Sequence, residues 1–580
     1  MKRMIKNPML MTDFYKTIHH LAYVPGLEYL VSYWTPRMSR IPSVEKAVLF
    51  GLQYYMKKYL IDAFNEDFFN VPWEDLEKEY VRLIGHTMTK QAANADFLKE
   101  LHDLGYLPIE ISAVPEGTRV PLRCPMIQIK NTVKGFGWLV NYIETLTSCN
   151  IWAPITGATI GANFREKQEY YYNLSVVPTD PSAPPKAALC GDFAMRGMMT
   201  PEAAFVMSAS HLLSYTGSAT IAATPFLEAY YNCDCEKEVV GKGVPSTEHS
   251  VMSSYGRDGE FECYRHLIED VFPEGLLSIV SDTYDYWNVL TNYIPKLKDS
   301  ILKRDGKIII RGDIGDPVDI VCGKLKAEDY MVIDGLTEDG IKDYFKNYAK
   351  EKWCGDCRAH TSWFNVRIND YLYYVEAHHK FIEDECEGFY VSAVEDVTFE
   401  KSEITPAMKG TVELLWDTFG GYVNEKGYKV LDKHIGAIYG DGITIDRATA
   451  IWKRLTDKGF SISNASLGIG SFTYQYLTRD SLSQALKATH SIVEGEERQI
   501  YKDPITDKVK GNNFKKSQRG ACYLYKDEDG EIKYTDGHTL EELKDDKYKD
   551  NLLVPVFRDG KILKETSLAE IRNRLHNGDF

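Results

Sequence analysis

The chain of 580 residues has 44% hydrophobic and 26% charged residues, a composition typical of a globular protein with roughly two to four domains. Its formal net charge of −16 disfavours nonspecific nucleic-acid binding, because there is no basic excess to displace counterions from phosphates. A small phosphate ligand remains compatible with this charge, since it needs only a few local cations.

The sequence contains no run of about 18 apolar residues, so we expect no transmembrane helix. Near the N-terminus, Asp13 and Lys16 interrupt the apolar stretch, which does not fit a signal peptide. Eleven cysteines, an odd number scattered along the chain, fit free thiols in a reducing cytoplasm. We therefore expect a cytoplasmic protein with small-molecule substrates and no nucleic-acid or membrane partner.

The predicted elements divide the chain into three parts. Residues 1–185 mix strand-like runs such as 29–34 with helical stretches such as 48–64, and end in a proline-rich loop at 178–186. From 186 to 484, short apolar strands alternate with helical segments, which predicts a parallel α/β fold. Within it, the polar, tyrosine-rich stretch 323–430 lacks this alternation and is interpreted as an inserted lobe.

The remaining residues, 485–580, carry the signals of β-hairpins followed by a terminal helix. Asp-Gly turns join strand-like arms at 525–534 and 556–563. The helix is expected over 567–575, with Ser567 as its N-cap.

Four predicted strands end in acidic or glycine-rich turns, at 276–285, 307–317, 435–446 and 465–471. Ligands of α/β folds bind beyond the carboxyl ends of parallel strands, so four such ends favour a shared site over unrelated turns. In IIIRGDIGDP (308–317), Arg311 can grip a phosphate, and Asp313 and Asp316 can hold Mg²⁺ or sugar hydroxyls.

Three further blocks carry candidate chemistry. Phe193 and Arg196, at a strand-to-helix junction, suit a flat ring beside a phosphate or carboxylate, although a core phenylalanine and a surface arginine are the commoner outcome. Glu248 and His249 precede Ser250, which is expected to open a helix, and His249 is a candidate base or phosphoryl acceptor.

The third block is GIGSFTYQYLTRDSL (468–482). Glycines between a strand and a helix offer backbone N–H groups and the helix dipole to a phosphate. Arg479 lies eight positions beyond Ser471, about two turns along a continuing helix. The spacing matches neither a Walker loop nor a Rossmann fingerprint.

In this order the blocks resemble the nicotinamide phosphoribosyltransferase family, close kin of the nicotinate phosphoribosyltransferases. The resemblance covers most of the chain outside the insertion, through TDFYK (12–16), SYWTPR (32–37), FGLQYYMKKYL (50–60), DFAMRG (192–197), PSTEHS (245–250), SDTYD (281–285), IIIRGDIGDP, YGDG (439–442), LTRD (477–480) and YKDP (501–504).

The resemblance implies the fold and the reaction. The fold is an α/β type II phosphoribosyltransferase: an incomplete barrel, here 186–484, with a smaller mixed α+β domain built from both chain ends, 1–185 and 485–580. The reaction transfers phosphoribosyl from phosphoribosyl diphosphate to nicotinamide, giving nicotinamide mononucleotide in NAD salvage. The family also implies Mg²⁺, ATP as a coupled co-substrate, and a head-to-tail homodimer with active sites at the interface.

The resemblance also assigns roles to matching residues. Phe193 stacks on the pyridine, Tyr15 arrives from the partner subunit, Arg311 binds the amide and phosphate region, and Arg196 binds diphosphate. The catalytic set is His249, which ATP phosphorylates, with Glu248 and Asp313, and the implied Mg²⁺ ligands are Asp282 and Asp313. The further substrate-binding residues are Asp13, Ala219, Val244, Ser278, Gly312, Gly440, Asp441, Gly470, Ser471 and Arg479, and those for ATP and diphosphate are Arg37, Lys487, Lys502 and Lys510.

Ala219 departs from the family pattern. Nicotinamide-using members carry there an aspartate that accepts a hydrogen bond from the carboxamide, whereas nicotinate members carry a small residue, since an aspartate would repel a carboxylate. Against a nicotinate preference, those members usually show a His-x-His pattern where this chain has Ser246-Thr247-Glu248-His249, and Gly191 stands where a histidine is common. Nicotinamide is the favoured substrate and nicotinate the alternative; a third hypothesis is an inactive sensor or scaffold.

The inserted lobe contains a possible zinc site. Cys354 and Cys357 have zinc or redox spacing, and His360, His378, His379 and Cys386 follow downstream. A thioredoxin-like role lacks its βαβ context, and unpaired thiols are the favoured interpretation.

Overall fold

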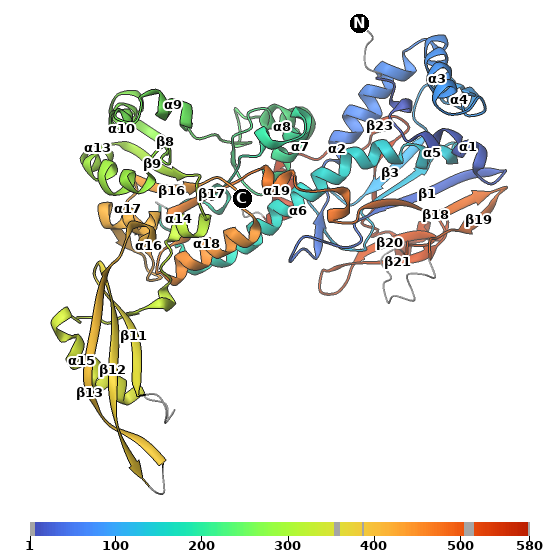
Figure 1. The fold of residues 1–580 in the computed structure, drawn as a ribbon. Helices are drawn as coiled ribbons and strands as arrows, with labels where there is room; N and C mark the ends of the chain where they lie inside the picture. Colours follow the sequence, from blue (N-terminus) through green and yellow to red (C-terminus); the bar gives the residue numbers. More distant parts are fainter. Residues whose placement is uncertain (1–5, 182, 353–359, 385–387, 504–515, 578–580) are drawn as a thin grey trace. The chain divides into compact units, whose positions relative to one another are not determined.

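The computed structural model describes residues 6–181, 183–352, 360–384, 388–503 and 516–577. The chain divides into two compact units, which we describe separately. Unit 1 comprises Met1–Glu166, Pro185–Gly243 and Ile469–Phe580, and unit 2 comprises Lys167–Pro184 and Val244–Gly468. Figure 1 shows the elements of both units in chain order.

Unit 1 is built on a seven-stranded antiparallel sheet that joins both ends of the chain. The expected strand at 29–34 is one of its inner strands, β1 (Leu27–Thr35), which is buried on both faces over its second half. The strand order is β19 (Glu496–Gln499), β18 (Ala485–Val493), β1, β5 (Ile127–Asn131), β3 (Ile109–Ala113), β22 (Val554–Arg558) and β23 (Lys561–Ile562).

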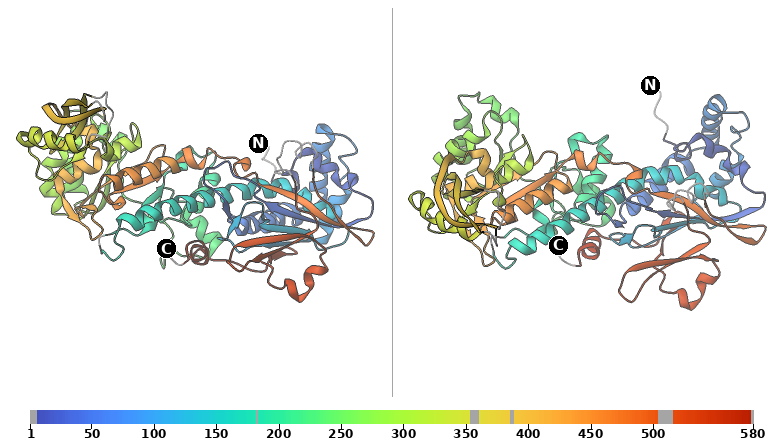
Figure 2. Two further views of the ribbon diagram at one scale, coloured as in Figure 1. Left: turned by 90° about the horizontal axis from the view of Figure 1, so that it is seen from below. Right: turned by 60° about the horizontal axis from the view of Figure 1, so that its bottom comes forward.

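Both faces of this sheet are covered (Figures 1 and 2). On one face lie α3 (Trp73–Thr87), α4 (Asp96–Leu104) and α5 (Gly137–Tyr142), and on the other lies the hairpin of β20 (Ala521–Lys526) and β21 (Ile532–His538). Their apolar side chains form one core with those of the sheet. Both predicted hairpins are confirmed, since β20 pairs with β21 and β22 pairs with β23.

A second core in unit 1 joins α7 (Pro201–His211), α8 (Ala223–Tyr231) and the terminal helix α21 (Leu568–His576). Ser567 caps α21 by accepting the N–H of Glu570, as predicted. The helix expected over 48–64 begins only at Leu52, as α2 (Leu52–Tyr55) and its π-helical continuation Met56–Ala63, because residues 46–48 form strand β2 (Lys46–Val48).

Arg572 anchors α21 to unit 1. Its guanidinium is buried and donates to the carbonyl oxygens of Leu212, Val239 and Val240 at 2.6–3.0 Å. Arg572→Met leaves these acceptors without donors, including the buried carbonyl oxygens of Leu212 and Val240, so we expect the free energy of unfolding to fall by about 3 kcal/mol. Ser567→Ala removes only the cap and should cost about 1 kcal/mol. Denaturant unfolding of both variants checks this order, and equal losses would contradict it.

Unit 2 contains four parallel strands in sequential order. They are β8 (Glu274–Val280), β9 (Asp305–Gly312), β16 (Ile435–Tyr439) and β17 (Ala465–Ile469). Each of the four predicted strand ends therefore follows a real strand. Around the strands lie α9 (His249–Ser254), α10 (Glu260–His266), α14 (Pro317–Cys322), α17 (Thr411–Phe419) and α18 (Ile445–Asp457), giving an incomplete α/β barrel.

The inserted lobe of unit 2 is a small sheet and helix with a hydrophobic core of its own. Strands β10 (Met331–Val332), β11 (Thr361–Ile368), β12 (Tyr371–Asp384) and β13 (Gly388–Glu403) form a sheet, and α15 (Ile341–Lys352) packs on one face. The lobe is shorter than the expected 323–430, because α17 returns to the barrel and buries Leu415.

The two units also divide the chain differently from the expected domains. Residues 186–243 and 469–484, expected in the barrel-like domain, belong to unit 1. The reason is packing: α7 and α8 bury Leu212 and Leu227 against residues from both chain ends, such as Phe50 and Ile571. No helix of the described residues is long and apolar enough to cross a membrane. Seven of the described cysteines are free thiols: Cys124, Cys149, Cys233, Cys235, Cys263, Cys322 and Cys522.

Candidate active site

Three strand ends of unit 2 meet at one edge of the parallel sheet, as expected. Arg311, at the end of β9, is in register with Val280 of β8 and Ile438 of β16. The segments that follow these strands, with Asp282, Asp313 and the Gly440-Asp441 turn, therefore start at the same level. Tyr439 donates to the Gly315 carbonyl oxygen at 2.9 Å and ties the β16 end to the loop after β9.

An arginine and two aspartates form the centre of this edge. Arg311 Nη2 lies 2.9 Å from Asp313 Oδ2, and the Asp313 N–H donates to Asp282 Oδ2 at 3.2 Å. Four buried polar atoms here have no hydrogen-bond partner among the described residues: Ser278 Oγ, Asp282 Oδ1, Arg311 Nε and Asp313 Oδ1. Buried polar groups normally have hydrogen-bond partners, so these four atoms are available to bind a ligand.

His249 lies beside this cluster as the first residue of α9. Its Nδ1 is 3.2 Å from Thr283 Oγ1 and its Nε2 is 3.7 Å from Asp282 Oδ1, while its side chain is 52% exposed. Thr283 thus orients the imidazole and Nε2 remains open to a substrate. Sequence reasoning missed Thr283, although it stands inside the SDTYD motif.

One expectation about the neighbours of His249 is wrong. Ser250 does not open the helix, because α9 starts at His249 with Glu248 in the N-cap position. Glu248 accepts a hydrogen bond from the Ser250 hydroxyl. Val244 is exposed, and its carbonyl oxygen accepts a hydrogen bond from the Ser246 hydroxyl. Ser246 also forms a parallel β-bridge with Ser278.

The donor set fits a hard divalent cation that shares its ligands with a substrate. The described residues contain no group of three or more His, Cys, Asp or Glu side chains that could hold a metal alone. Asp282 and Asp313 nevertheless each present a buried oxygen without a hydrogen-bond partner among the described residues. Mg²⁺ commonly takes one or two carboxylates and fills its remaining positions with phosphate oxygens and water.

In unit 1, two short parallel strands bring Phe193 and Ala219 together. β6 (Cys190–Asp192) pairs with β7 (Gly217–Ser218), and the Ala219 N–H donates to the Asp192 carbonyl at 2.9 Å. Phe193 is half-buried, and its ring lies against Gly191, where a Cβ would be 3.4 Å from the ring.

The loop after Phe193 packs on the glycine-rich turn at 470–471. A Cβ on Gly197 would lie 1.9 Å from Ser471 Oγ, so only glycine allows this approach. Arg196 is exposed beside it. The predicted helix through Arg479 is wrong: α19 (Ser471–Tyr474) has four residues, and the exposed Arg479 begins a separate 3-10 turn that Thr478 caps.

Further predicted residues gather elsewhere in unit 1, around Glu144. This carboxylate lies 2.7 Å from Lys16 Nζ and 3.5 Å from Lys487 Nζ, next to the exposed Tyr15. Asp13 accepts from the Thr145 hydroxyl at 2.7 Å. Burial raises the pKa of the Tyr15 phenol, and Asp13 and Glu144 add to the rise.

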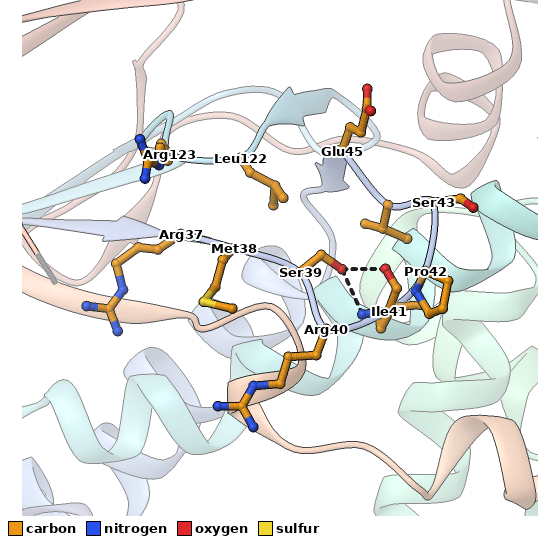
Figure 3. A pocket seen from close by; sticks show the side chains of 11 residues that line it. Arg37, Met38, Ser39, Arg40, Ile41, Pro42, Ser43, Glu45, Leu122 and Arg123 are labelled. Carbon is orange, nitrogen blue, oxygen red and sulfur yellow. Dashed lines mark hydrogen bonds between the residues drawn. The ribbon is translucent and has the colours of Figure 1, made fainter. Parts of the chain in front are cut away.

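Arginines also collect at the end of β1. Arg37 Nε donates to the Ser483 carbonyl oxygen. Burial, and to a smaller extent repulsion from Arg479, lowers the pKa of Arg37. Figure 3 shows Arg37 with Arg40 and Arg123 around an open pocket of about 530 Å³. The lining contains these three arginines and one acidic residue, Glu45, and this positive excess favours an anionic ligand; sequence reasoning missed Arg40 and Arg123.

The remaining predictions have mixed outcomes. The Lys502 N–H donates to Ser517 Oγ, whereas Lys510 lies outside the described residues. So do Cys354, Cys357 and Cys386. Of the proposed zinc-site histidines, His378 bonds the Thr361 hydroxyl and His379 bonds the Ser362 hydroxyl, at 3.1 and 2.6 Å.

Comparison with known proteins identifies the family. The model of the nicotinate phosphoribosyltransferase (NAPRTase) family matches residues 188–352 and 393–560. The chain belongs to this family. It is a phosphoribosyltransferase, and the model of the nicotinamide phosphoribosyltransferase N-terminal domain matches residues 7–78.

The relatives of this phosphoribosyltransferase match nearly its whole length. The nicotinamide phosphoribosyltransferase of Acinetobacter baylyi is 35% identical and covers 98% of this chain and 97% of its own. That of Xanthomonas campestris is 28% identical over 98% of both chains. Among solved structures, nicotinate-nucleotide pyrophosphorylase from Pyrococcus furiosus aligns with a TM-score of 0.50 at 13% identity, covering 100% and 98% of the two chains. The type II phosphoribosyltransferase fold is thus confirmed.

Proposed function

We propose that this phosphoribosyltransferase makes nicotinamide mononucleotide and diphosphate from nicotinamide and phosphoribosyl diphosphate. The observation that carries the proposal is the Asp282–Arg311–Asp313 cluster, with its unbonded buried polar atoms, in a chain whose relatives bear this name. The pyridine nitrogen attacks C1 of the ribose, and diphosphate leaves with the electron pair. The sugar becomes oxocarbenium-like, as in glycoside chemistry.

The charges of the described residues suit each part of this reaction. Arg311 and Arg196 offer cations to phosphate and diphosphate oxygens. Asp282 and Asp313 would hold Mg²⁺, which when bound would neutralise the charge of the leaving diphosphate. Phe193 supplies a ring face for the pyridine. Gly440, Asp441, Gly470 and Ser471 are assigned to the ribose and its 5′-phosphate.

We further propose that ATP stimulates the transfer through phosphorylation of His249. The exposed Nε2 acts as the nucleophile, and Thr283 holds Nδ1. Hydrolysis of the phosphohistidine then couples ATP to an unfavourable transfer. Arg37, Lys487, Lys502 and Lys510 are assigned to ATP and diphosphate.

We also propose that the protein forms a homodimer and that it acts in the cytoplasm. Two apolar patches of unit 1 support the homodimer, because contiguous exposed apolar side chains are typical of interfaces. One patch contains Phe14, Tyr15 and Leu21, each more than half exposed. The other contains Phe472 and Tyr476, whose rings stack, and Met199, whose N–H donates to the Gln475 side chain; the three are 57–85% exposed.

The test is a turnover assay with phosphoribosyl diphosphate, Mg²⁺ and one pyridine at a time, with and without ATP. We expect nicotinamide mononucleotide by mass spectrometry, formed faster with ATP. Turnover of nicotinate alone would establish the second candidate, which Ala219 favours. Binding without turnover of either pyridine would establish an inactive sensor or scaffold.

Ala219→Asp is expected to raise the nicotinamide-to-nicotinate ratio of kcat/KM about tenfold or more. The new carboxylate accepts a hydrogen bond from the carboxamide and repels the carboxylate of nicotinate, effects of about 1.5–3 kcal/mol. Ala219→Asn, equal in size but uncharged, is the matched control and should shift the ratio less. An unchanged ratio in Ala219→Asp would remove residue 219 as a determinant.

A further inference from the structure

Asp192 is a buried carboxylate directly beneath the strand ends that carry Phe193 and Ala219. Its side chain has no solvent exposure. Oδ1 accepts from the Ala194 N–H at 3.0 Å, and Oδ2 accepts from the hydroxyls of Ser218 at 2.8 Å and Thr220 at 3.1 Å. Each of these partners donates, so the Asp192 carboxyl group acts here only as an acceptor.

The two faces of the β6–β7 pair have different chemistry. Asp192 and Ser218 are paired in register and point to the side where α7 contributes Ser208, which donates to Thr220 at 2.9 Å. Gly191 and Gly217 turn to the other side, where the ring of Phe193 lies. The Asp192 carboxylate therefore lies on the face of the two strands opposite to the face on which Phe193 and Ala219 lie.

Asp192 takes its hydrogen bonds from one backbone N–H and two hydroxyls, and no ion pair joins it to a lysine, arginine or histidine among the described residues. His211, which interacts electrostatically with Asp192, is buried, stacks on Tyr215 and bonds the Tyr474 hydroxyl at 2.7 Å. Burial lowers the pKa of His211 to about 4 against the opposing effect of Asp192, and so favours the neutral imidazole. A buried charge without a counter-ion projects its potential into its surroundings.

We propose that Asp192 is a specificity-determining and positioning residue, whose charge makes the pyridine site favour a neutral 3-substituent and a cationic ring. The inference rests on the proposed function. Transfer turns the neutral pyridine nitrogen into a pyridinium, and a fixed negative charge stabilises that developing positive charge. The same charge repels the carboxylate of nicotinate. Asp192 thus favours the amide although Ala219 offers no side-chain acceptor.

Two variants separate charge from scaffolding. Asp192→Asn removes the charge at nearly constant volume, and Ser218→Ala removes one hydrogen bond but keeps the charge. We expect Asp192→Asn to lower the nicotinamide-to-nicotinate ratio of kcat/KM about tenfold, the size of one charge acting at short range in a protein. Ser218→Ala should slow both substrates alike and leave the ratio unchanged. A ratio that is the same in Asp192→Asn and wild type would overturn the proposal.

A binding measurement on the wild-type protein covers the case that Asp192→Asn does not fold. Nicotinamide mononucleotide carries a pyridinium, whereas its reduced dihydropyridine form has nearly the same shape and an uncharged ring. Titration calorimetry should find the cationic form bound about tenfold more tightly, and equal affinities would contradict the inference. If wild type turns over neither pyridine, the proposed function fails; if it turns over nicotinamide with an unaltered variant ratio, only the role of Asp192 fails.

Discussion

Arg311→Met is expected to lower kcat/KM for phosphoribosyl transfer about 10²–10³-fold, the usual cost of removing a preorganised donor from a reacting phosphate or oxyanion. Arg311 is 14% exposed, pairs with Asp313 and keeps a buried Nε without a partner. Its loss removes a cation from the substrate and leaves Asp313 without its ion pair. Steady-state kinetics with varied phosphoribosyl diphosphate measures the effect.

The matched control is Arg454→Met. Arg454 is an arginine of the same unit, 21% exposed, and it pairs with Asp319 at 2.7 Å between α18 and α14. It should lose stability but keep kcat/KM within about threefold of wild type. Equal losses of activity in the two variants would mean that Arg311 acts only through folding.

His249→Ala is expected to abolish the stimulation by ATP while transfer without ATP continues. The imidazole is the only group that we assign to accept the phosphoryl group, and alanine offers no nucleophile. Incubation with γ-³²P-ATP should label wild type in an acid-labile, base-stable form and leave His249→Ala unlabelled. The rate increment that ATP produces should fall at least tenfold, comparable to the loss of a positioned catalytic group.

His266 provides a stringent control for that experiment. It is 42% exposed on the neighbouring α10 and lies 3.0 Å from Asp270, so it repeats the histidine–aspartate pairing of His249. His266→Ala should retain both the label and the stimulation. Labelling that survives in His249→Ala but disappears in His266→Ala would reassign the phosphoryl acceptor.

The ends of these strands could be predicted because an apolar run that stops at glycine and aspartate usually forms a buried strand followed by a turn. The runs at 276–285, 307–317, 435–446 and 465–471 each contain the end of an observed parallel strand. Their adjacency follows from the rule that carboxyl ends of parallel strands share an edge. The cap of α21 was equally local, since Ser567 and Glu570 form a capping box within one turn.

What could not be predicted depends on contacts between distant segments. Thr283 matters because its hydroxyl meets His249, 34 positions earlier. Asp192 looks like an ordinary turn residue until β7 brings the hydroxyls of Ser218 and Thr220 onto its carboxylate. Residues 186–243 join unit 1 because α7 and α8 pack against both chain ends, and no local pattern reveals such packing.

Internal competition between the two pyridines tests the central claim most directly. Equal concentrations of nicotinamide and nicotinate are mixed with limiting phosphoribosyl diphosphate, Mg²⁺ and ATP, and the two mononucleotides are quantified by mass spectrometry, so that their ratio equals the ratio of kcat/KM. The account predicts that nicotinamide mononucleotide predominates. Predominance of nicotinate mononucleotide, or the absence of both products, would contradict it.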